Sequence, residues 1–400
     1  MRILQINTVY KTGSTGKIAY ELHQRLKSSG YNSVVYYGRG GKVVNEDAYK
    51  FANRFGVYLH VLITRVIGIT GFSSNLSTAI LLRAIKKYKP DVVHLHNLHG
   101  YYLNLYHVIK YLKKKSIKTI WTLHDEFMLT GMCGFSITCM NWMTGCGHCP
   151  RVSDYPKSFF LDFTRWQLQK KKKVFEGFTD LTFVTPSEWL RRQVKKSIVK
   201  EINCVVIPNG INVDRVFYPR DYQARIAEMG LSGKKLILSV VSDFFDQRKG
   251  GRHFIELANL LRKEEELHFI IIGYNDAIEK LPSNVTGIRR TENQDELALF
   301  YTAADLFVIL SEIENLPTVC LESLACGTPV VGFDAGGTKE TAPDTLGEFV
   351  TYGGMETLEL AVRTALKKKS PEVSEECRKY AIQNYSIDKM FQKYVKLYQG

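Results

Sequence analysis

The feature that most constrains the fold is a regular alternation of short apolar runs with helix-like segments along all 400 residues. The apolar runs are continuous rather than alternating, as expected for parallel strands that are covered on both faces. We therefore predict strands at Ile3–Thr8, Ser33–Tyr37, Val92–His96, Thr119–Leu123, Leu181–Thr185, Lys235–Val241, His268–Ile272, Leu306–Leu310 and Pro329–Phe333.

Helix-like segments lie between these runs, at Lys17–Ser29, Ala79–Tyr88, Glu188–Ser197, Gly251–Lys263 and Gln294–Ala303. Repeated strand–helix alternation implies doubly wound sheets, and one sheet cannot hold all of it. We predict an α/β fold with two tandem Rossmann-like domains and a ligand cleft between them. The expected domains are residues 1–205 and 206–385, and residues 386–400 form a helix that packs back on the first domain.

The charge is divided unevenly along the chain. Residues 1–210 carry 31 basic and 12 acidic side chains, whereas the remainder carries 23 and 28, for a total of +14. This asymmetry predicts an anionic partner for the first half, either nucleic acid or a membrane surface. No segment has the apolar length of a bilayer span. Because the amino terminus runs directly into a strand-like segment, we expect no signal peptide. We expect a cytoplasmic protein that can lie on the inner face of the membrane.

A glycine-rich turn, Thr8–Lys17, follows the first strand. Gly13 and Gly16 are too close for a Walker loop, Ile18 follows the lysine, and the first glycine of a dinucleotide fingerprint is missing. Backbone N–H groups at a helix start can bind an anion, although a plain tight turn is the better explanation of this loop on its own.

Histidines end two later strands of the first half. The segment HLHNLHG begins at His94 and includes His96 and Asn97, and His124 is followed by Asp125. Open α/β sheets bind ligands at this edge. A core position is the better interpretation of His94, whereas the position of His124 favours a functional role.

The second half contains the turn DQRKG, in which Arg248 and Lys249 are adjacent. Arginine offers forked donors and lysine a point charge, a combination that suits a diphosphate. A solvated turn is nevertheless the better explanation of this segment in isolation.

The strongest signal is the segment Glu312–Val330, in which Glu314 and Glu322 are eight residues apart. Glu314 is expected on a loop, and Glu322 inside the helix that follows. A carboxylate among the small and apolar neighbours of Glu322 is costly unless it has a hydroxyl or cationic partner. Two carboxylates near a helix start suit sugar hydroxyls, although a solvent-facing Glu322 is an equally good explanation of that residue alone.

Four cysteines follow the strand that ends near His124, in the order C-x5-C-x6-C-x2-C. Four thiolates can close a tetrahedral zinc site that leaves no open position for catalysis, so we expect a structural zinc, with His148 as a substitute ligand. Two disulfides or four thiols packed as small hydrophobes are the alternatives. The residues are Cys133, Cys139, Cys146 and Cys149.

Together these motifs resemble glycosyltransferase family four, whose members are retaining enzymes of the GT-B fold. The resemblance covers nearly the whole chain and includes the segments VTPSEWL at Val184–Leu190 and IPNGIN at Ile207–Asn212. The stretches HLHNLHGYYLN, WTLHD and CGHCP are most similar to the branch of colanic-acid and capsule sugar transferases.

The resemblance implies a donor site in the second half. Glu322 would hold the ribose hydroxyls of a sugar nucleotide. Glu314, together with the backbone N–H groups of Asn315 and Leu316, would hold hydroxyls of the donor sugar.

Two cations are implied for the donor diphosphate, Lys249 and Arg248. In the family an arginine usually precedes the K-G pair by several residues, but here that segment is Val241–Phe244. The arginine role therefore passes to Arg248. Both cations would stabilise the charge that develops on the leaving diphosphate.

In the first half, the resemblance places His124 beside the anomeric centre. Gly13 and Gly16 would approach the diphosphate and the acceptor, and His96 and Asn97 would contact substrate. No cofactor is expected to be required for catalysis. The expected partners are a UDP- or GDP-linked sugar, a saccharide acceptor carried on a lipid, and an anionic membrane surface, but no nucleic acid.

Two other functions remain open. A sugar-nucleotide epimerase or a phosphorylase could use the same fold, and would consume the donor without an acceptor sugar. A nucleic-acid-binding protein would use the lysine runs at Lys113–Lys115 and Lys170–Lys173 to follow phosphates. Such runs are usually solvated helix faces, and no nucleic-acid motif accompanies them.

Overall fold

The structure is a computed structural model that describes residues 1–275 and 280–400. Its contacts divide the chain into unit 1, Met1–Ile207 with Phe391–Gly400, and unit 2, Pro208–Met390. The sequence predicts divisions after residues 205 and 385, and the structure places them after residues 207 and 390. In the described part of the chain, no helix combines the length and the apolar character needed to cross a membrane.

Unit 1 is built on a seven-stranded parallel sheet in the order β3-β2-β1-β4-β5-β6-β7. The sequence of connections changes direction between β1 and β4, since successive strands are added first on one side of β1 and then on the other. The carboxyl ends of β1 and β4 therefore flank the position where ligands bind in such sheets. The strands are β1 Arg2–Asn7, β2 Asn32–Tyr37, β3 Ala48–Lys50, β4 Val92–Leu95, β5 Lys118–Thr122, β6 Leu181–Thr185 and β7 Asn203–Val206.

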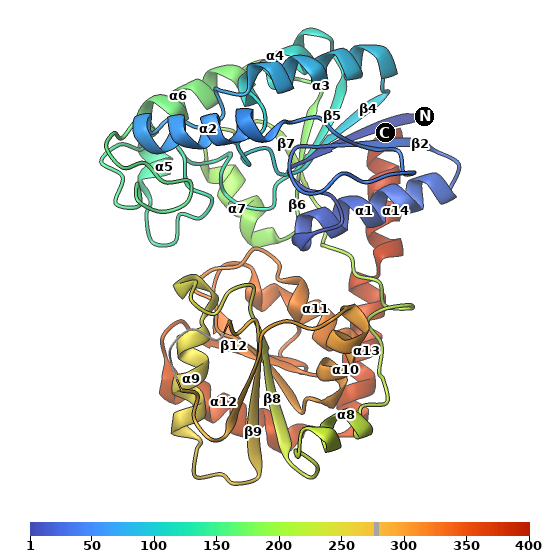
Figure 1. The fold of residues 1–400 in the computed structure, drawn as a ribbon, viewed down its shortest axis with the longest axis vertical. Helices are drawn as coiled ribbons and strands as arrows, with labels where there is room; N and C mark the ends of the chain where they lie inside the picture. Colours follow the sequence, from blue (N-terminus) through green and yellow to red (C-terminus); the bar gives the residue numbers. More distant parts are fainter. Residues whose placement is uncertain (276–279) are drawn as a thin grey trace. The chain divides into compact units, whose positions relative to one another are not determined.

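Helices cover both faces of this sheet, with α3 and α4 on one side and α1 and α14 on the other (Figure 1). Trp121 on β5 and Phe183 on β6 are fully buried under them. The helices are α1 Gly13–Ser28, α2 Arg54–Ile67, α3 Asn75–Tyr88, α4 Leu105–Lys114, α5 Asn141–Thr144, α6 Thr164–Phe175, α7 Glu188–Lys196 and α14 Ile387–Gln399.

The last helix contributes to unit 1 through two tyrosines. The Tyr394 hydroxyl lies 2.7 Å from Thr122 Oγ1, and the Tyr398 hydroxyl lies 2.7 Å from His94 Nδ1. Both tyrosines are at most 2 % exposed. Their apolar spacing in the sequence thus corresponds to a helix face that closes one side of the sheet.

Unit 2 is built on a six-stranded parallel sheet in the order β10-β9-β8-β11-β12-β13. Helices α9 and α12 lie on one side of it, and α10, α11 and α13 on the other (Figure 1). Its elements are α8 Gln223–Glu228, β8 Lys235–Val240, η1 Gln247–Lys249, α9 Gly251–Leu260, β9 Leu267–Ile272, β10 Val285–Ile288, α10 Gln294–Ala303, β11 Leu306–Ile309, α11 Thr318–Ala325, β12 Val330–Asp334, η2 Thr338–Thr341, β13 Gly347–Thr351, α12 Met355–Lys368 and α13 Pro371–Tyr385.

The predicted helix at Lys17–Ser29 begins too late. Helix α1 starts at Gly13, because the glycine-rich turn itself forms the first helical turn. The predicted helix at Gly251–Lys263 ends too late, since α9 stops at Leu260.

Candidate active site

Lys249 and Glu314 meet at the carboxyl edge of the sheet in unit 2. Lys249 Nζ lies 2.6 Å from Glu314 Oε1, and the two side chains are 25 % and 16 % exposed. Of the three donors on a lysine ammonium, this contact uses one, and two remain for phosphate oxygens. The contact places a cation and a carboxylate within one small volume, as the sequence analysis expects for a donor site.

A glycine makes this approach possible. Gly250 has a φ of +76°, and a Cβ there would lie 2.1 Å from the carbonyl oxygen of Leu310 at the end of β11. The Glu312 N–H donates to the carbonyl of Arg248 at 2.8 Å. The K-G pair therefore holds the cationic turn directly against the end of β11, close to the loop of Glu314.

The loop that carries Glu314 is fixed from a second side. The Glu314 N–H donates to the Ala335 carbonyl at 3.3 Å, and the Gly337 N–H donates to the Glu314 carbonyl at 2.8 Å. The next residue, Asn315, is buried, and the Leu316 carbonyl accepts from Asn209 Nδ2 at 3.1 Å. The turn after β12 and the IPNGIN segment thus position the donor-site residues expected from the sequence.

Glu322 lies inside α11 and is 8 % exposed, so the solvent-facing interpretation of this residue is wrong. The hydroxyl of the fully buried Tyr301 donates to Glu322 Oε2 at 3.1 Å. Burial and the charge of Glu322 raise the pKa of Tyr301 well above its usual value, so Tyr301 stays a neutral donor. The partner that such a carboxylate requires is therefore a tyrosine hydroxyl.

Arg248 shares the η1 turn with Lys249 but binds within its own turn. Its Nη2 lies 2.7 Å from Asp246 Oδ2, and Asp246 Oδ1 also accepts from the Arg248 N–H at 3.1 Å. A phosphate would have to compete with Asp246 for this guanidinium. Both cations of the turn therefore have a carboxylate partner, Asp246 for Arg248 and Glu314 for Lys249, with which a phosphate would compete.

In unit 1, the glycine-rich turn leaves the start of α1 open. Thr12 occupies the N-cap position without a side-chain capping bond, and Gly13 has a φ of +63°. A Cβ on Gly16 would lie 3.1 Å from Val9 Cγ2, which is tighter than an ordinary contact, so a side chain here would press against Val9. First-turn N–H groups that lack a side-chain cap can bind an anion.

Asn7, which the sequence analysis missed, joins this turn to the histidine segment. Its Oδ1 accepts from the N–H groups of Thr8 at 2.9 Å and of Asn97 at 3.2 Å. Thr8 Oγ1 in turn donates to the Asn97 carbonyl at 2.7 Å. The predicted residues Gly13 and Asn97 therefore belong to loops held together at one sheet edge.

His96 and His124 are neighbours, with His96 Nδ1 3.3 Å from His124 Nε2 and His96 Nε2 3.1 Å from Gln5 Oε1. Burial lowers the pKa of His124 to about 4, although Asp125 opposes the shift. Burial also lowers the pKa of His96 well below its usual value. Both rings are neutral at pH 7, so His124 can exchange hydrogen bonds with a sugar without adding charge.

His94 has the core position expected for it. It is fully buried, and its Nε2 lies 2.8 Å from Thr122 Oγ1. Burial lowers its pKa to about 3. Both ring nitrogens of His94 thus contact buried hydroxyl groups, so neither is available to a substrate.

The structure adds a close histidine–aspartate hydrogen bond that the sequence analysis missed. His99 Nε2 lies 2.6 Å from Asp125 Oδ2, with side chains 10 % and 15 % exposed. Burial raises the pKa of Asp125, but His99 and the Phe127 N–H outweigh it and the net shift is downward. The signal was present in the sequence, because His99 falls on the strand-end segment that already contained two candidate histidines.

A buried lysine supports the loop after His124. Lys171 is 1 % exposed, and its Nζ donates to the carbonyls of Phe127 and, at 2.9 Å, Thr130. Burial lowers its pKa to about 7. The sequence showed only a lysine run, but Lys171 shares its helix face with the buried Leu168 and Val174, and that period could have identified it.

The four clustered cysteines line one small cavity. Within ranges 1–275 and 280–400, however, no group of three or more His, Cys, Asp or Glu side chains is arranged to hold a metal ion. Burial raises the pKa of Cys133 to about 12 and also raises those of Cys146 and Cys149, so thiols rather than thiolates are favoured here. Zinc binds thiolates, so a zinc ion would have to displace these thiol protons. The zinc site stays a prediction.

Known families match both halves of the chain. The family described as Glycosyltransferase Family 4 matches residues 15–215, half of the chain, and that described as Glycosyl transferases group 1 matches residues 222–384. The chain belongs to glycosyltransferase family four. The enzyme is therefore a glycosyltransferase, and the resemblance inferred from the sequence motifs is confirmed.

Individual relatives agree with this membership. The chain is 26 % identical to a protein of Escherichia coli (strain K12) that is named as a colanic acid biosynthesis glycosyl transferase, WcaC, over the full length of both chains. The solved structure of Anabaena Alr3699/HepE in complex with UDP-glucose has a TM-score of 0.67 at 14 % identity, and 99 % of each chain is covered.

A further solved structure, WaaG, a glycosyltransferase involved in lipopolysaccharide biosynthesis, has a TM-score of 0.68 at 17 % identity over the full length of both chains. At such identities the likeness concerns the fold, and it confirms the predicted GT-B class.

Proposed function

We propose that this glycosyltransferase moves a sugar, with retention of configuration, from a nucleoside-diphosphate sugar to a saccharide acceptor carried on a lipid. The product would enter a surface polysaccharide. The observation that carries the proposal is the contact of Lys249 with Glu314, together with the buried Glu322 on the helix that follows the Glu314 loop. One edge of one sheet thereby offers a cation for phosphate and two carboxylates for hydroxyls.

Each residue has a task in this reaction. Glu322 would accept hydrogen bonds from the ribose hydroxyls, and Glu314 from the donor sugar. As the bond from C1 to the phosphate oxygen breaks, negative charge grows on the diphosphate, and Lys249 with Arg248 would stabilise it. The leaving phosphate oxygen can take the proton of the acceptor hydroxyl, so neither a protein nucleophile nor a metal is needed.

Unit 1 would serve the acceptor and the anomeric centre. The neutral ring of His124, oriented by its 3.3 Å contact with His96, suits a hydrogen bond to the transferred sugar. The open start of α1 at Gly13 and Gly16 would meet phosphate or acceptor hydroxyls.

The comparisons support the substrate classes. Anabaena Alr3699/HepE has been solved with UDP and with UDP-glucose, which favours a nucleotide-sugar donor. The Escherichia coli relative is named for colanic acid biosynthesis, which favours a polysaccharide product. The basic first half favours attachment to an anionic membrane surface.

The test is the release of nucleoside diphosphate from a panel of UDP- and GDP-sugars, with and without extracted lipid-linked saccharides and with a chelator present. We expect release that depends on the acceptor and persists with the chelator, and a product whose anomeric configuration, read by NMR, equals that of the donor. Donor consumption without any acceptor sugar would instead indicate an epimerase or a phosphorylase. Inversion of the anomeric centre would contradict the mechanism.

A further inference from the structure

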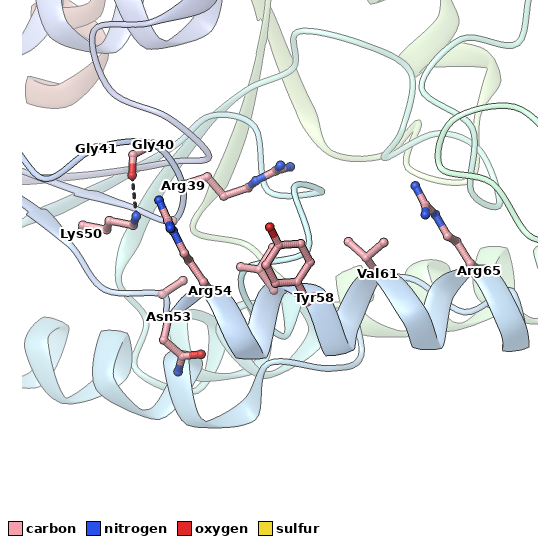
Figure 2. Close-up of a pocket in the computed structure, with 12 residues that line it drawn as sticks. Arg39, Gly40, Gly41, Lys50, Asn53, Arg54, Tyr58, Val61 and Arg65 are labelled. Atoms are coloured by element: carbon pink, nitrogen blue, oxygen red, sulfur yellow. Dashed lines mark hydrogen bonds between the residues drawn. The ribbon is translucent and has the colours of Figure 1, made fainter.

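Unit 1 contains a pocket of about 460 Å³ between the turn after β2 and helix α2. Figure 2 shows Arg54, Tyr58, Val61 and Arg65 rising from the same side of α2, while Arg39 reaches over them from the turn. Neither family motifs nor the donor site account for this pocket.

The pocket is cationic. Four of the side chains that line it, Arg39, Lys50, Arg54 and Arg65, are basic, and none of its described lining residues is acidic. Lys50 Nζ donates to the Gly40 carbonyl. Within ranges 1–275 and 280–400, none of the three arginines forms an ion pair. Four cations that share a small volume repel one another, so an anion in this pocket would be stabilised.

Helix α2 itself is oriented in an unusual way. The residues it buries are the polar His60 and Thr64. Both have partners, since His60 Nε2 accepts from the Gly71 N–H at 3.1 Å and Thr64 Oγ1 donates to the Ile69 carbonyl at 3.0 Å. The apolar side of the helix is therefore left outside, which is the reverse of an ordinary surface helix.

The exposed side forms an apolar strip next to the pocket. Phe55, Leu59, Leu62 and Val66 recur at helical spacing and are 79, 46, 58 and 42 % exposed. The loop Phe159–Leu161 continues this strip, since the Phe159 N–H donates to the Arg65 carbonyl at 2.8 Å. Its three side chains are also exposed. A contiguous apolar patch of this kind marks an interaction surface.

We propose that this surface docks on the membrane, with the apolar strip of α2 in the bilayer interface and the phosphate or diphosphate headgroup of the acceptor lipid in the cationic pocket. An anion beside a hydrocarbon surface is the chemistry of a lipid phosphate, whereas a free anion would use the cationic pocket alone. An interfacial helix with an apolar strip and arginines along the neighbouring face fits this role. The inference rests on the proposed function, because it assumes that the acceptor saccharide is carried on a lipid.

The test is flotation of the full chain with three kinds of vesicle: phosphatidylcholine alone, phosphatidylcholine with phosphatidylglycerol, and phosphatidylcholine with a polyprenyl diphosphate at equal surface charge. We expect the tightest binding to the diphosphate vesicles. Equal binding to both anionic vesicles would overturn the headgroup pocket. Equal binding to all three, or to none, would overturn the docking surface.

Two variants separate the features. Arg54→Gln with Arg65→Gln should weaken binding to diphosphate vesicles by about tenfold or more, since hydrogen bonds to charged groups are the strong ones. Leu62→Glu should weaken binding to every vesicle. The matched control, Lys114→Gln with Lys115→Gln, removes the same charge from exposed positions at the end of α4 and should bind as the wild type does. An equal loss in this control and the arginine variant would overturn the pocket.

Competition identifies the source of the anion. Farnesyl diphosphate should displace the protein from vesicles at much lower concentration than inorganic diphosphate, and equal potency would overturn the lipid assignment. UDP binding is measured on the same samples. If UDP binding and transfer to acceptor persist without any vesicle preference, this inference fails and the proposed function stands. If UDP binding is absent, the proposed function fails with it.

Discussion

Replacing Lys249 with methionine removes one charge from the contact that we consider most important. Glu314 then loses a partner at 2.6 Å and keeps its partly buried position. Exposed ion pairs contribute about 0.2–1 kcal/mol, and breaking a fully buried pair costs about 3–5 kcal/mol. Side chains that are 25 % and 16 % exposed lie between these cases. We therefore expect the free energy of unfolding to fall by about 1–2 kcal/mol.

Turnover should suffer far more than stability. A single donor aimed at developing charge typically contributes about 10²–10³ in kcat, and Lys249 is placed to act on the diphosphate as it leaves. The assay is steady-state release of nucleoside diphosphate together with thermal unfolding, in Lys249→Met and in Lys249→Arg, which keeps the charge. A kcat for Lys249→Met within threefold of the wild type, in a protein that is still folded, would refute the assignment.

Three further predictions concern other sites. Glu314→Ala should lower kcat about tenfold or more while the dissociation constant for free nucleoside diphosphate changes little. A loss of nucleotide affinity as large as the loss of kcat would contradict a contact between Glu314 and the donor sugar. Burial lowers the pKa of His60 from 6.5 to about 4, so the unfolded chain binds the proton first, and the free energy of unfolding should fall as the pH drops from about 6.5 to 4. A pH slope unchanged by His60→Gln would contradict this. A zinc clamp predicts one zinc per chain in protein purified without added metal; metal-free protein with eight titratable thiols would leave only the packing alternative, and fewer thiols would indicate disulfides.

Much of the fold was predictable because buried parallel strands are continuously apolar. Leu181–Thr185 and Gln294–Ala303 have the predicted bounds, and the inner strands differ by a residue or two. The strands that the sequence analysis missed lie near sheet edges, where part of the strand is exposed to solvent and the apolar run is short. Examples are β3, of three residues, and β10, whose sequence VTGI is mostly half-buried.

The candidate site was predictable where spacing determines geometry. Only a turn and the first residues of α11 separate Glu314 from Glu322, so the positions of both residues could be predicted from local structure. Tyr301, Asn7 and Lys171 could not be found in the same way, because their partners are 21 or more residues away or belong to the backbone. The reversed orientation of α2 was also missed, since its apolar residues predict a buried face, and only the packing of His60 and Thr64 shows which side is inside.

The central claim is that unit 2 binds a nucleoside diphosphate through Glu322. Isothermal titration of UDP and GDP into the wild type, Glu322→Gln and the exposed control Glu348→Gln tests it directly. Hydrogen bonds to a carboxylate contribute about 1.5–3 kcal/mol, so Glu322→Gln should weaken the preferred nucleotide by about tenfold or more, while Glu348→Gln binds as the wild type does. Equal affinity in all three proteins, with Glu322→Gln still folded, would contradict the account.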